Sequence, residues 1–324
     1  MDEPDWKIPE RLQPAPDQCG FDLDSTLRSV MVVRANIPPD ASTAQLLGTE
    51  RSGNAVLIGK DGLALTIGYL INEAETVWLT GTGSQVAPAH VIAIDQPSGF
   101  GLVQALGRLD LPTLEIGESK DVARGDNAIF AASGGRPHAL KVEIAGRQPF
   151  AGYWEYLLEH PFFTHPAHPV WSGGALIGDN GRLIGIGSLI VQHTMGDGRQ
   201  TDLNMVVPTE LLTPIIDELL TKGRSGAPPR PWLGLYCGEN DGTVFVQRVT
   251  AGGPADQAHL RSGDRIVAVA ETEIEDLATL WRAVWAQGSA GVTIPITLSR
   301  GTGTFEAEIV SADRAARLKG PRLQ

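Results

Sequence analysis

The sequence predicts a mainly β protein with two domains. Its 324 residues are too many for one ordinary hydrophobic core and suit about two domains. The turn Asp179-Asn180-Gly181 separates two apolar runs, at 175–177 and 183–188, which is the pattern of a β-hairpin. Nearer the other end, apolar and polar residues alternate over 292–299, as they do in a half-buried strand.

Two amphipathic helices and a linker organise the rest of the chain. Residues 209–220 show helical periodicity that stops before Gly223, and residues 223–230 form a linker whose consecutive prolines favour a semi-rigid spacer. Asp276 caps a second helix that extends to about residue 287. The ends are predicted to be an extended, Pro-rich and acidic arm at 1–25 and a basic, solvated tail at 313–324.

The segment Trp171-Ser172-Gly173-Gly174 carries the main chemical signal. Glycines after a serine let the chain turn tightly, so that the backbone N–H groups around the serine can point at one spot. Such converging donors form an oxyanion hole, which stabilises negative charge on a substrate oxygen. Ser172 is therefore a candidate nucleophile at the mouth of the predicted hairpin, and a plain turn before the strand is the simpler alternative.

Other runs accompany this serine in a recognisable order. They are the strand pair 53–58 and 61–66, the segment 94–103, and the segment Asn204-Met205-Val206-Val207-Pro208. Together they resemble the protease domain of the HtrA family over residues 26–222, where the first pair delivers a catalytic histidine and the second segment a catalytic aspartate. This resemblance implies a trypsin-like double β-barrel with Ser172 in the nucleophile position.

Three positions depart from the family pattern. Tyr69 stands at the histidine position, Gly99 at the aspartate position, and Val170 replaces the glycine whose N–H contributes to the oxyanion hole. A phenol, with a pKa of about 10, accepts a proton poorly near neutral pH, whereas an imidazole has a pKa of about 6.5. Loss of a triad's base costs on the order of 10⁶-fold in turnover. We interpret the chain as a pseudoprotease in which Ser172 is inactive and Tyr69 is its hydrogen-bond partner or plug.

Histidines shortly before the serine offer an alternative base. His160, His165 and His168 precede Ser172, and a relocated serine–histidine dyad would make the chain a weak or conditional serine endopeptidase. The spacing of these histidines is not a recognised set of zinc ligands. We therefore expect neither a metal nor a cofactor.

The second half resembles the PDZ domain of the same family. The run Arg230-Pro231-Trp232-Leu233-Gly234-Leu235 resembles the family's carboxylate-binding segment, and residues 249–255 and 258–266 match further PDZ patterns. In such domains, successive backbone N–H groups bind the C-terminal carboxylate of a peptide that adds a strand to the sheet. The resemblance implies a small α+β PDZ-like domain over 231–312, with Trp232, Leu233, Gly234 and Leu235 as peptide-binding residues.

Composition excludes several classes of partner. The formal net charge of -12 argues against a nucleic-acid partner, because a phosphate backbone requires a basic face. No apolar run is long enough to span a membrane, and no signal-peptide pattern begins the sequence, which predicts a cytoplasmic protein, or a periplasmic one if a leader was removed. Two cysteines, Cys19 and Cys237, make a disulfide framework improbable.

These observations lead to one preferred function and two alternatives. The preferred function is a catalytically impaired HtrA-like protein that binds peptides, protein C-termini or unfolded clients, in a chaperone, adaptor or decoy role. One alternative is the weak endopeptidase that uses Ser172 and an unrecognised base. The other is a structural subunit of a mixed assembly with an active HtrA-like protease. The resemblance also suggests a homo-oligomer, such as a trimer.

Overall fold

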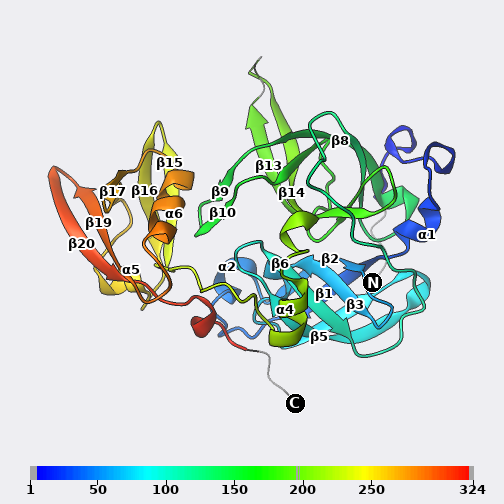
Figure 1. Ribbon diagram of the computed structural model, residues 1–324, viewed down its shortest axis with the longest axis horizontal. Coiled ribbons are helices and arrows are strands. Elements are labelled where there is room, and N and C mark those ends of the chain that lie inside the picture. Colours follow the sequence, from blue (N-terminus) through cyan, green and yellow to red (C-terminus); the bar gives the residue numbers. More distant parts are fainter. Residues whose placement is uncertain (1–5, 195, 197, 321–324) are drawn as a thin grey trace. The chain divides into compact units, whose positions relative to one another are not determined.

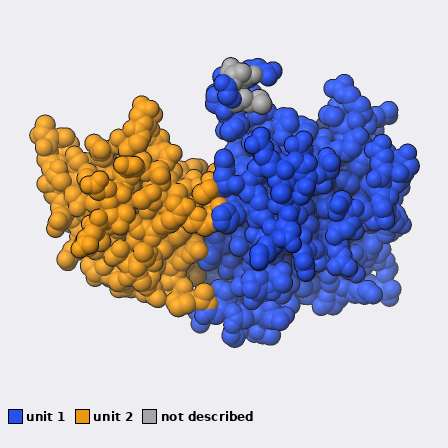
Figure 2. All heavy atoms as spheres, turned by 45° about the horizontal axis from the view of Figure 1, so that its top comes forward, with its two compact units in different colours: residues 1–148, 160–226, 319–324 blue, residues 149–159, 227–318 orange. Residues whose placement is uncertain are grey.

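The computed structural model describes residues 6–194, 196 and 198–320 (Figure 1). The chain forms two compact units (Figure 2). Unit 1 contains residues 1–148, 160–226 and 319–324, and unit 2 contains 149–159 and 227–318. The segment 149–159, which lies inside the predicted range 26–222, belongs with unit 2, where Leu157 is part of the core.

The first part of unit 1 is a closed antiparallel barrel with the strand order β1-β2-β3-β6-β5-β4. Its third strand is buried along its whole length, and its one polar residue, Thr66, donates its hydroxyl to the Asn54 carbonyl at 2.6 Å. The short helices α2 (Ala44–Leu47) and α3 (Gly68–Ile71) lie between strands. The strands are β1 (Val30–Asn36), β2 (Glu50–Leu57), β3 (Leu63–Ile67), β4 (Thr76–Thr80), β5 (Val86–Ile94) and β6 (Phe100–Ala105).

The second part of unit 1 is another closed barrel, with the strand order β11-β14-β13-β12-β7-β8. Phe130, Phe162 and Leu176 are fully buried in its core. The predicted hairpin is confirmed, because β12 pairs with the start of β13 across the turn at Asn180. The strands are β7 (Asn127–Ala131), β8 (Ala139–Arg147), β11 (Phe162–His165), β12 (Ala175–Ile177), β13 (Leu183–Thr194) and β14 (Gln200–Pro208).

The segments before, between and after the barrels differ in part from the predictions. From residue 6 on, the predicted extended arm instead packs on unit 1, because Ile8 and Leu23 bury their apolar side chains. The predicted helix 209–220 is divided by Pro214, which cannot donate a helical hydrogen bond. The short elements are 3₁₀ turns η1 (Glu10–Leu12), η2 (Pro16–Gln18), η3 (Thr82–Ser84), η4 (Arg136–His138) and η5 (Thr209–Leu211), with helices α1 (Leu23–Leu27) and α4 (Ile216–Lys222). Residues 1–5 and 321–324 of the predicted arm and tail lie outside the described residues.

Unit 2 is an antiparallel sheet with the order β15-β16-β17-β19-β20 and a helix packed against it. The predicted helix is confirmed as α6 (Leu277–Ala286), where the Asp276 carboxylate accepts the Thr279 N–H at 2.6 Å. The predicted alternating strand is confirmed as β19 (Thr293–Arg300). The other elements are β9 (Phe150–Gly152), β10 (Tyr156–Leu158), β15 (Leu235–Asn240), β16 (Thr243–Val249), α5 (Pro254–Gln257), β17 (Arg265–Val269), β18 (Thr272–Glu273), β20 (Gly303–Val310) and η6 (Ala315–Arg317).

Candidate functional site

Ser172 lies in the loop that enters β12, against a strand of the other barrel. Its carbonyl oxygen accepts hydrogen bonds from the backbone N–H and the side-chain Nδ2 of Asn54, at 2.8 and 3.0 Å. The next residue, Gly173, has φ +73°, and a Cβ there would lie 1.9 Å from the Asn54 carbonyl oxygen. Only glycine fits this close approach, so the glycine after the serine lets strand β2 hold the serine loop in place.

Tyr69, on α3, points its hydroxyl at the serine. The phenol oxygen lies 2.7 Å from Ser172 Oγ and 2.7 Å from the Ser188 carbonyl oxygen, to which it donates. A phenol has one hydrogen, so the Ser172 hydroxyl must donate to the Tyr69 oxygen. Burial raises the pKa of Tyr69 to about 12. The serine's proton is therefore directed at a neutral phenol, which is a poor base near neutral pH.

Two features fix the position of the Tyr69 side chain. Ser188 falls at a register shift in the pairing of β13 with β14, so its carbonyl can accept the phenol hydrogen instead of a ladder bond. The Arg51 guanidinium donates to the Tyr69 carbonyl at 2.7 Å and to the Asn72 carbonyl at 3.1 Å, which anchors both ends of α3. The same guanidinium donates to the Thr43 hydroxyl at 2.7 Å.

The predicted aspartate position, Gly99, contributes backbone contacts to the region behind Tyr69. The Gly68 N–H donates to the Gly99 carbonyl at 2.7 Å, and the Gly99 N–H donates to the Asp95 carbonyl at 2.8 Å. A Cβ on Gly68 would lie 3.1 Å from the Gly99 carbonyl oxygen and 2.8 Å from the Ile94 side chain. The nearby Asp95 carboxylate accepts the N–H and hydroxyl of Ser98, at 2.9 and 2.5 Å, and so closes its own turn.

The N–H at the predicted oxyanion position, Val170, is already bonded. His168 Nε2 lies 3.1 Å from the His138 carbonyl oxygen, which requires Nε2 to carry the ring hydrogen, and Nδ1 then accepts the Val170 N–H at 3.1 Å. Burial lowers the pKa of His168 to about 4, so the ring is neutral near pH 7. Both ring nitrogens of His168 thus bond to groups other than Ser172, and the Val170 N–H is directed at a side chain instead of a substrate oxygen.

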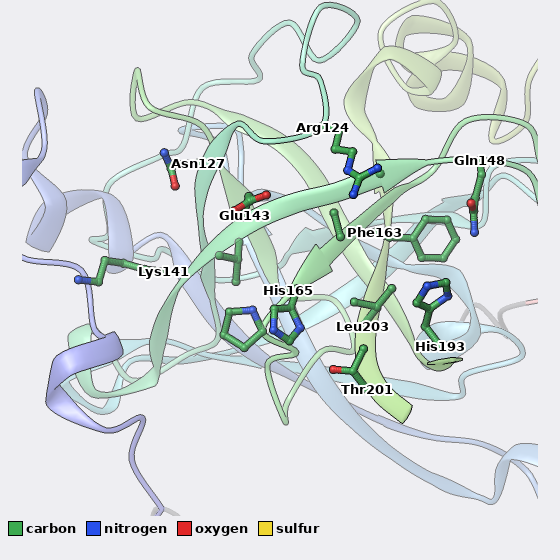
Figure 3. Close-up of a pocket in the computed structure, with 14 residues that line it drawn as sticks. Arg124, Asn127, Lys141, Glu143, Gln148, Phe163, His165, His193, Thr201 and Leu203 are labelled. Carbon is green, nitrogen blue, oxygen red and sulfur yellow. The ribbon is translucent and has the colours of Figure 1, made fainter. Parts of the chain in front are cut away.

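The other candidate histidines are on the surface. His160 is exposed, and His165 lies on β11 in a surface pocket of about 680 Å³ on the second barrel. Figure 3 shows the imidazoles of His165 and His193 among the side chains of this pocket. Ser172 does not line it. The structure therefore brings Ser172 together with Tyr69 and does not bring it together with these histidines.

The predicted peptide-binding residues form a loop that binds a carboxylate of the same chain. The backbone N–H groups of Leu233, Gly234 and Leu235 all donate to the Glu155 side chain, at 2.9, 2.6 and 2.9 Å. The N–H of Trp232 instead donates to the Ala312 carbonyl at 3.0 Å, so this residue stands outside the set of donors. Three convergent N–H groups are the arrangement that captures a carboxylate in a backbone concavity.

The surroundings of Glu155 affect its ionisation. Burial raises the pKa of Glu155 to about 7, an effect that the three N–H donors and the positive charge of Arg314 oppose. Burial and the neighbouring Glu155 carboxylate also raise the pKa of the Cys237 thiol, on β15. The carboxylate therefore sits in a poorly hydrated site whose hydrogen bonds come from the backbone.

Sequence reasoning missed Glu155 as the partner of this loop. Glu155 belongs to the run Tyr153-Trp154-Glu155-Tyr156, in which an acidic residue stands among aromatic side chains. Such a composition is typical of a segment that packs against another part of the chain, but it does not indicate which residues the carboxylate contacts. Trp281 is part of the predicted α6 pattern, where helical spacing accounts for it as a core residue.

Comparison with known families and structures agrees with the fold of the two units. The model of the trypsin-like peptidase domain matches residues 53–186, and the PDZ domain model matches residues 231–310. The chain therefore has the fold of a trypsin-like peptidase domain followed by the fold of a PDZ domain. Solved structures that share the fold of this chain include a serine endoprotease from Yersinia pestis, with a TM-score of 0.52, 20% identity, and 95% of this chain and 99% of that one covered. The HtrA-type protease AlgW, solved with a decapeptide, has a TM-score of 0.52, 18% identity and coverages of 97% and 100%.

Curated relatives of this chain are named as serine proteases. A "Probable periplasmic serine endoprotease DegP-like" from Chlamydia pneumoniae is 26% identical over 252 residues, which are 72% of this chain and 49% of the relative. The serine endoprotease DegS from Salmonella typhimurium is 24% identical over 269 residues, 76% of this chain and 73% of the relative. The chain spans about half the length of the DegP-like relatives that it matches.

The described part of the chain holds neither a membrane-spanning helix nor a cluster of metal-ligating side chains. Within residues 6–194, 196 and 198–320, no helix has the length and apolar character needed to cross a membrane. In those same ranges, no group of three or more histidine, cysteine, aspartate or glutamate side chains is arranged to hold a metal ion.

Proposed function

We propose that this HtrA-type protein is catalytically impaired and binds peptides or unfolded proteins through its PDZ domain, as a chaperone, adaptor or decoy. The observation that carries the first half of the proposal is the 2.7 Å contact between Tyr69 and Ser172. The serine donates its hydrogen to a buried phenol with a pKa of about 12, so no group at that position takes the proton when the serine attacks.

Two further contacts support the same conclusion. Gly99 has no carboxylate that could orient a base, and its backbone lies against Gly68. The Val170 N–H donates to His168, so one of the two expected oxyanion donors is engaged before a substrate arrives. Removing a single oxyanion donor costs about 10²- to 10³-fold in turnover, in addition to the loss of the base.

The second half of the proposal rests on the loop of unit 2. Leu233, Gly234 and Leu235 direct three N–H groups at one carboxylate, which is the chemistry needed for a peptide C-terminus. AlgW, whose fold this chain shares, was solved with a decapeptide, and the names of several relatives place them in the periplasm. These similarities support peptide binding and the periplasmic alternative for this chain.

A weak serine endopeptidase is the second candidate function. It is favoured by the retained Ser172 and by the names of the curated relatives, which are serine proteases. In this case a base would have to come from a rearranged loop, because the rings of His165 and His168 lie elsewhere in the structure.

Digestion of a denatured protein distinguishes the two candidates. The purified full chain and its Ser172→Ala variant are compared, both expressed in a host that lacks major proteases. We expect equal and negligible cleavage by the two proteins. Cleavage by the wild type that disappears in Ser172→Ala would refute catalytic impairment and support the endopeptidase.

Peptide titration tests the second half of the proposal separately. A labelled peptide with a free C-terminal carboxylate should bind better than the same peptide with a C-terminal amide, because the amide lacks the charge that the three N–H groups of the loop recognise. Equal affinity for the two peptides would contradict the assignment of Leu233, Gly234 and Leu235 as a carboxylate-binding loop.

A further inference from the structure

The carboxylate-binding loop of unit 2 is occupied by a side chain from a segment far away in the sequence. Glu155 accepts hydrogen bonds from three consecutive residues that lie 78, 79 and 80 positions further along the chain. Oε1 accepts from Gly234 and Leu235, and the Leu233 N–H is shared between Oε2 at 2.9 Å and Oε1 at 3.1 Å. Both carboxylate oxygens are thus bound as the two oxygens of a peptide C-terminus would be.

The backbone next to Glu155 runs along β15 as an added strand. Trp154 forms an antiparallel bridge with Tyr236, and the Cys237 N–H donates to the Tyr153 carbonyl at 2.6 Å. Moving away from the loop, β15 runs toward higher residue numbers while the paired segment runs toward lower ones. An antiparallel peptide whose last residue lies at the loop has the same direction, which is the geometry of strand addition to a PDZ sheet.

Helix α6 also contacts the hairpin formed by β9 and β10. Trp281 Nε1, on α6, donates to the Gly152 carbonyl at 3.1 Å. Leu157 is 5% exposed and joins the core cluster of unit 2, and the Arg282 guanidinium forms a paired contact with the Glu159 carboxylate at 2.6 and 2.9 Å. Figure 1 shows β9 and β10 beside α6. The hairpin is therefore held from the loop, from the strand and from the helix.

We propose that the β9–β10 hairpin is a built-in ligand of the PDZ groove, with Glu155 in the place of a peptide's terminal carboxylate, and that external C-termini bind only when the hairpin leaves. This inference rests on the proposed peptide-binding function. The loop and β15 cannot bind both segments at once, because the same N–H groups of Leu233, Gly234, Leu235 and Cys237 serve either one. If the hairpin is docked in about 99% of the molecules, the apparent affinity for an external peptide falls about 100-fold.

The experiment uses the full chain and two matched alanine variants of the same hairpin. Glu155→Ala removes the carboxylate from the loop, and Glu159→Ala removes the carboxylate that forms a half-exposed ion pair with Arg282, a kind of contact that contributes little to stability. Glu155→Gln, which keeps the side-chain size, replaces the alanine variant if the latter folds poorly. Protection of the amides in β16 and β19 reports whether unit 2 is folded in each variant.

The first measurement is amide hydrogen exchange at the loop. Exchange at Leu233, Gly234 and Leu235 should accelerate at least about tenfold in Glu155→Ala and by no more than about threefold in Glu159→Ala. The Trp232 N–H, which donates to the Ala312 carbonyl, should stay protected in all variants and serves as the internal reference. Unchanged exchange at the three loop amides in Glu155→Ala would overturn the inference, whatever peptides do.

The second measurement is fluorescence anisotropy with a short labelled peptide that ends in a free valine carboxylate, and with its C-terminal amide. The free acid should bind Glu155→Ala about 10- to 100-fold more tightly than it binds the wild type or Glu159→Ala, while the amide stays weak. If the acid binds all three proteins equally well, peptide binding stands and competition by the hairpin is refuted. If loop exchange accelerates but neither peptide binds Glu155→Ala, the hairpin remains a ligand of the loop and the proposed function fails.

Discussion

Tyr69→Phe tests the contact on which the pseudoprotease proposal depends. The change removes only the hydroxyl, so the Ser188 carbonyl loses the donor that lies 2.7 Å away. Ser188 is 4% exposed, and a buried acceptor without its donor costs about 1–3 kcal/mol. We expect the free energy of unfolding of unit 1 to fall by about 2 kcal/mol.

Ser172→Ala should lower the free energy of unfolding by less than Tyr69→Phe does, and the effects of the two substitutions should not be additive. Without the serine hydroxyl, Tyr69 still donates to Ser188, so only one hydrogen bond is lost, which is worth about 1 kcal/mol. Both single changes remove the same Tyr69–Ser172 bond. The double variant should therefore be more stable, by about 1 kcal/mol, than the sum of the two single losses predicts.

Native-state hydrogen exchange of amides in β1 and β13 measures these changes, because it reports unit 1 without requiring the two units to unfold together. Ser52→Ala, on the exposed side of β2, is the control and should change the free energy of unfolding by less than about 0.5 kcal/mol. Additive single effects, within about 0.3 kcal/mol, would show that the two hydroxyls are not bonded and would refute the argument that Tyr69 holds the serine's proton.

Two further predictions concern buried positions around the same site. Because the pKa of His168 is lowered from 6.5 to about 4, the unfolded chain takes up a proton before the native chain does, so this contribution to stability is full above pH 6.5 and is lost as the pH falls toward 4. The loss of stability amounts to about 3 kcal/mol by pH 4. Unfolding curves measured between pH 6.5 and pH 4 should show this pH dependence in the wild type and in a variant of the exposed His193, and should not show it in His168→Gln. Gly173→Ala should lower the free energy of unfolding by roughly 3 kcal/mol or more, since its Cβ would meet the Asn54 carbonyl at 1.9 Å and φ is +73°. Gly146→Ala, where nothing lies within 4 Å of the added Cβ, should change the free energy of unfolding little. Urea titrations of the two variants measure both changes, and equal effects would contradict this account.

Much of the fold could be predicted from local patterns. The turn at Asn180, the alternation in β19 and the Asp276 cap of α6 each involve residues close together in the sequence, and each prediction is confirmed. The helix predicted over 209–220 was too long, because its apolar spacing continues through Pro214 although the backbone cannot. The arm was predicted to be extended because its composition is Pro-rich and acidic. Ile8 and Leu23 are nevertheless buried, and the surface on which they pack is formed only by the folded chain.

The residue types around Ser172 and in the loop at 232–235 can be read from the sequence. The resemblance adds the prediction that Tyr69 and Gly99 stand where the family has a histidine and an aspartate. Only the tertiary structure decides the hydrogen-bond partners. Tyr69 and Ser172 are 103 residues apart, and Glu155 and Gly234 are 79 apart. Periodicity records which face of an element is buried, whereas a partner at such a distance depends on how the chain folds back, which no local pattern of one sequence encodes.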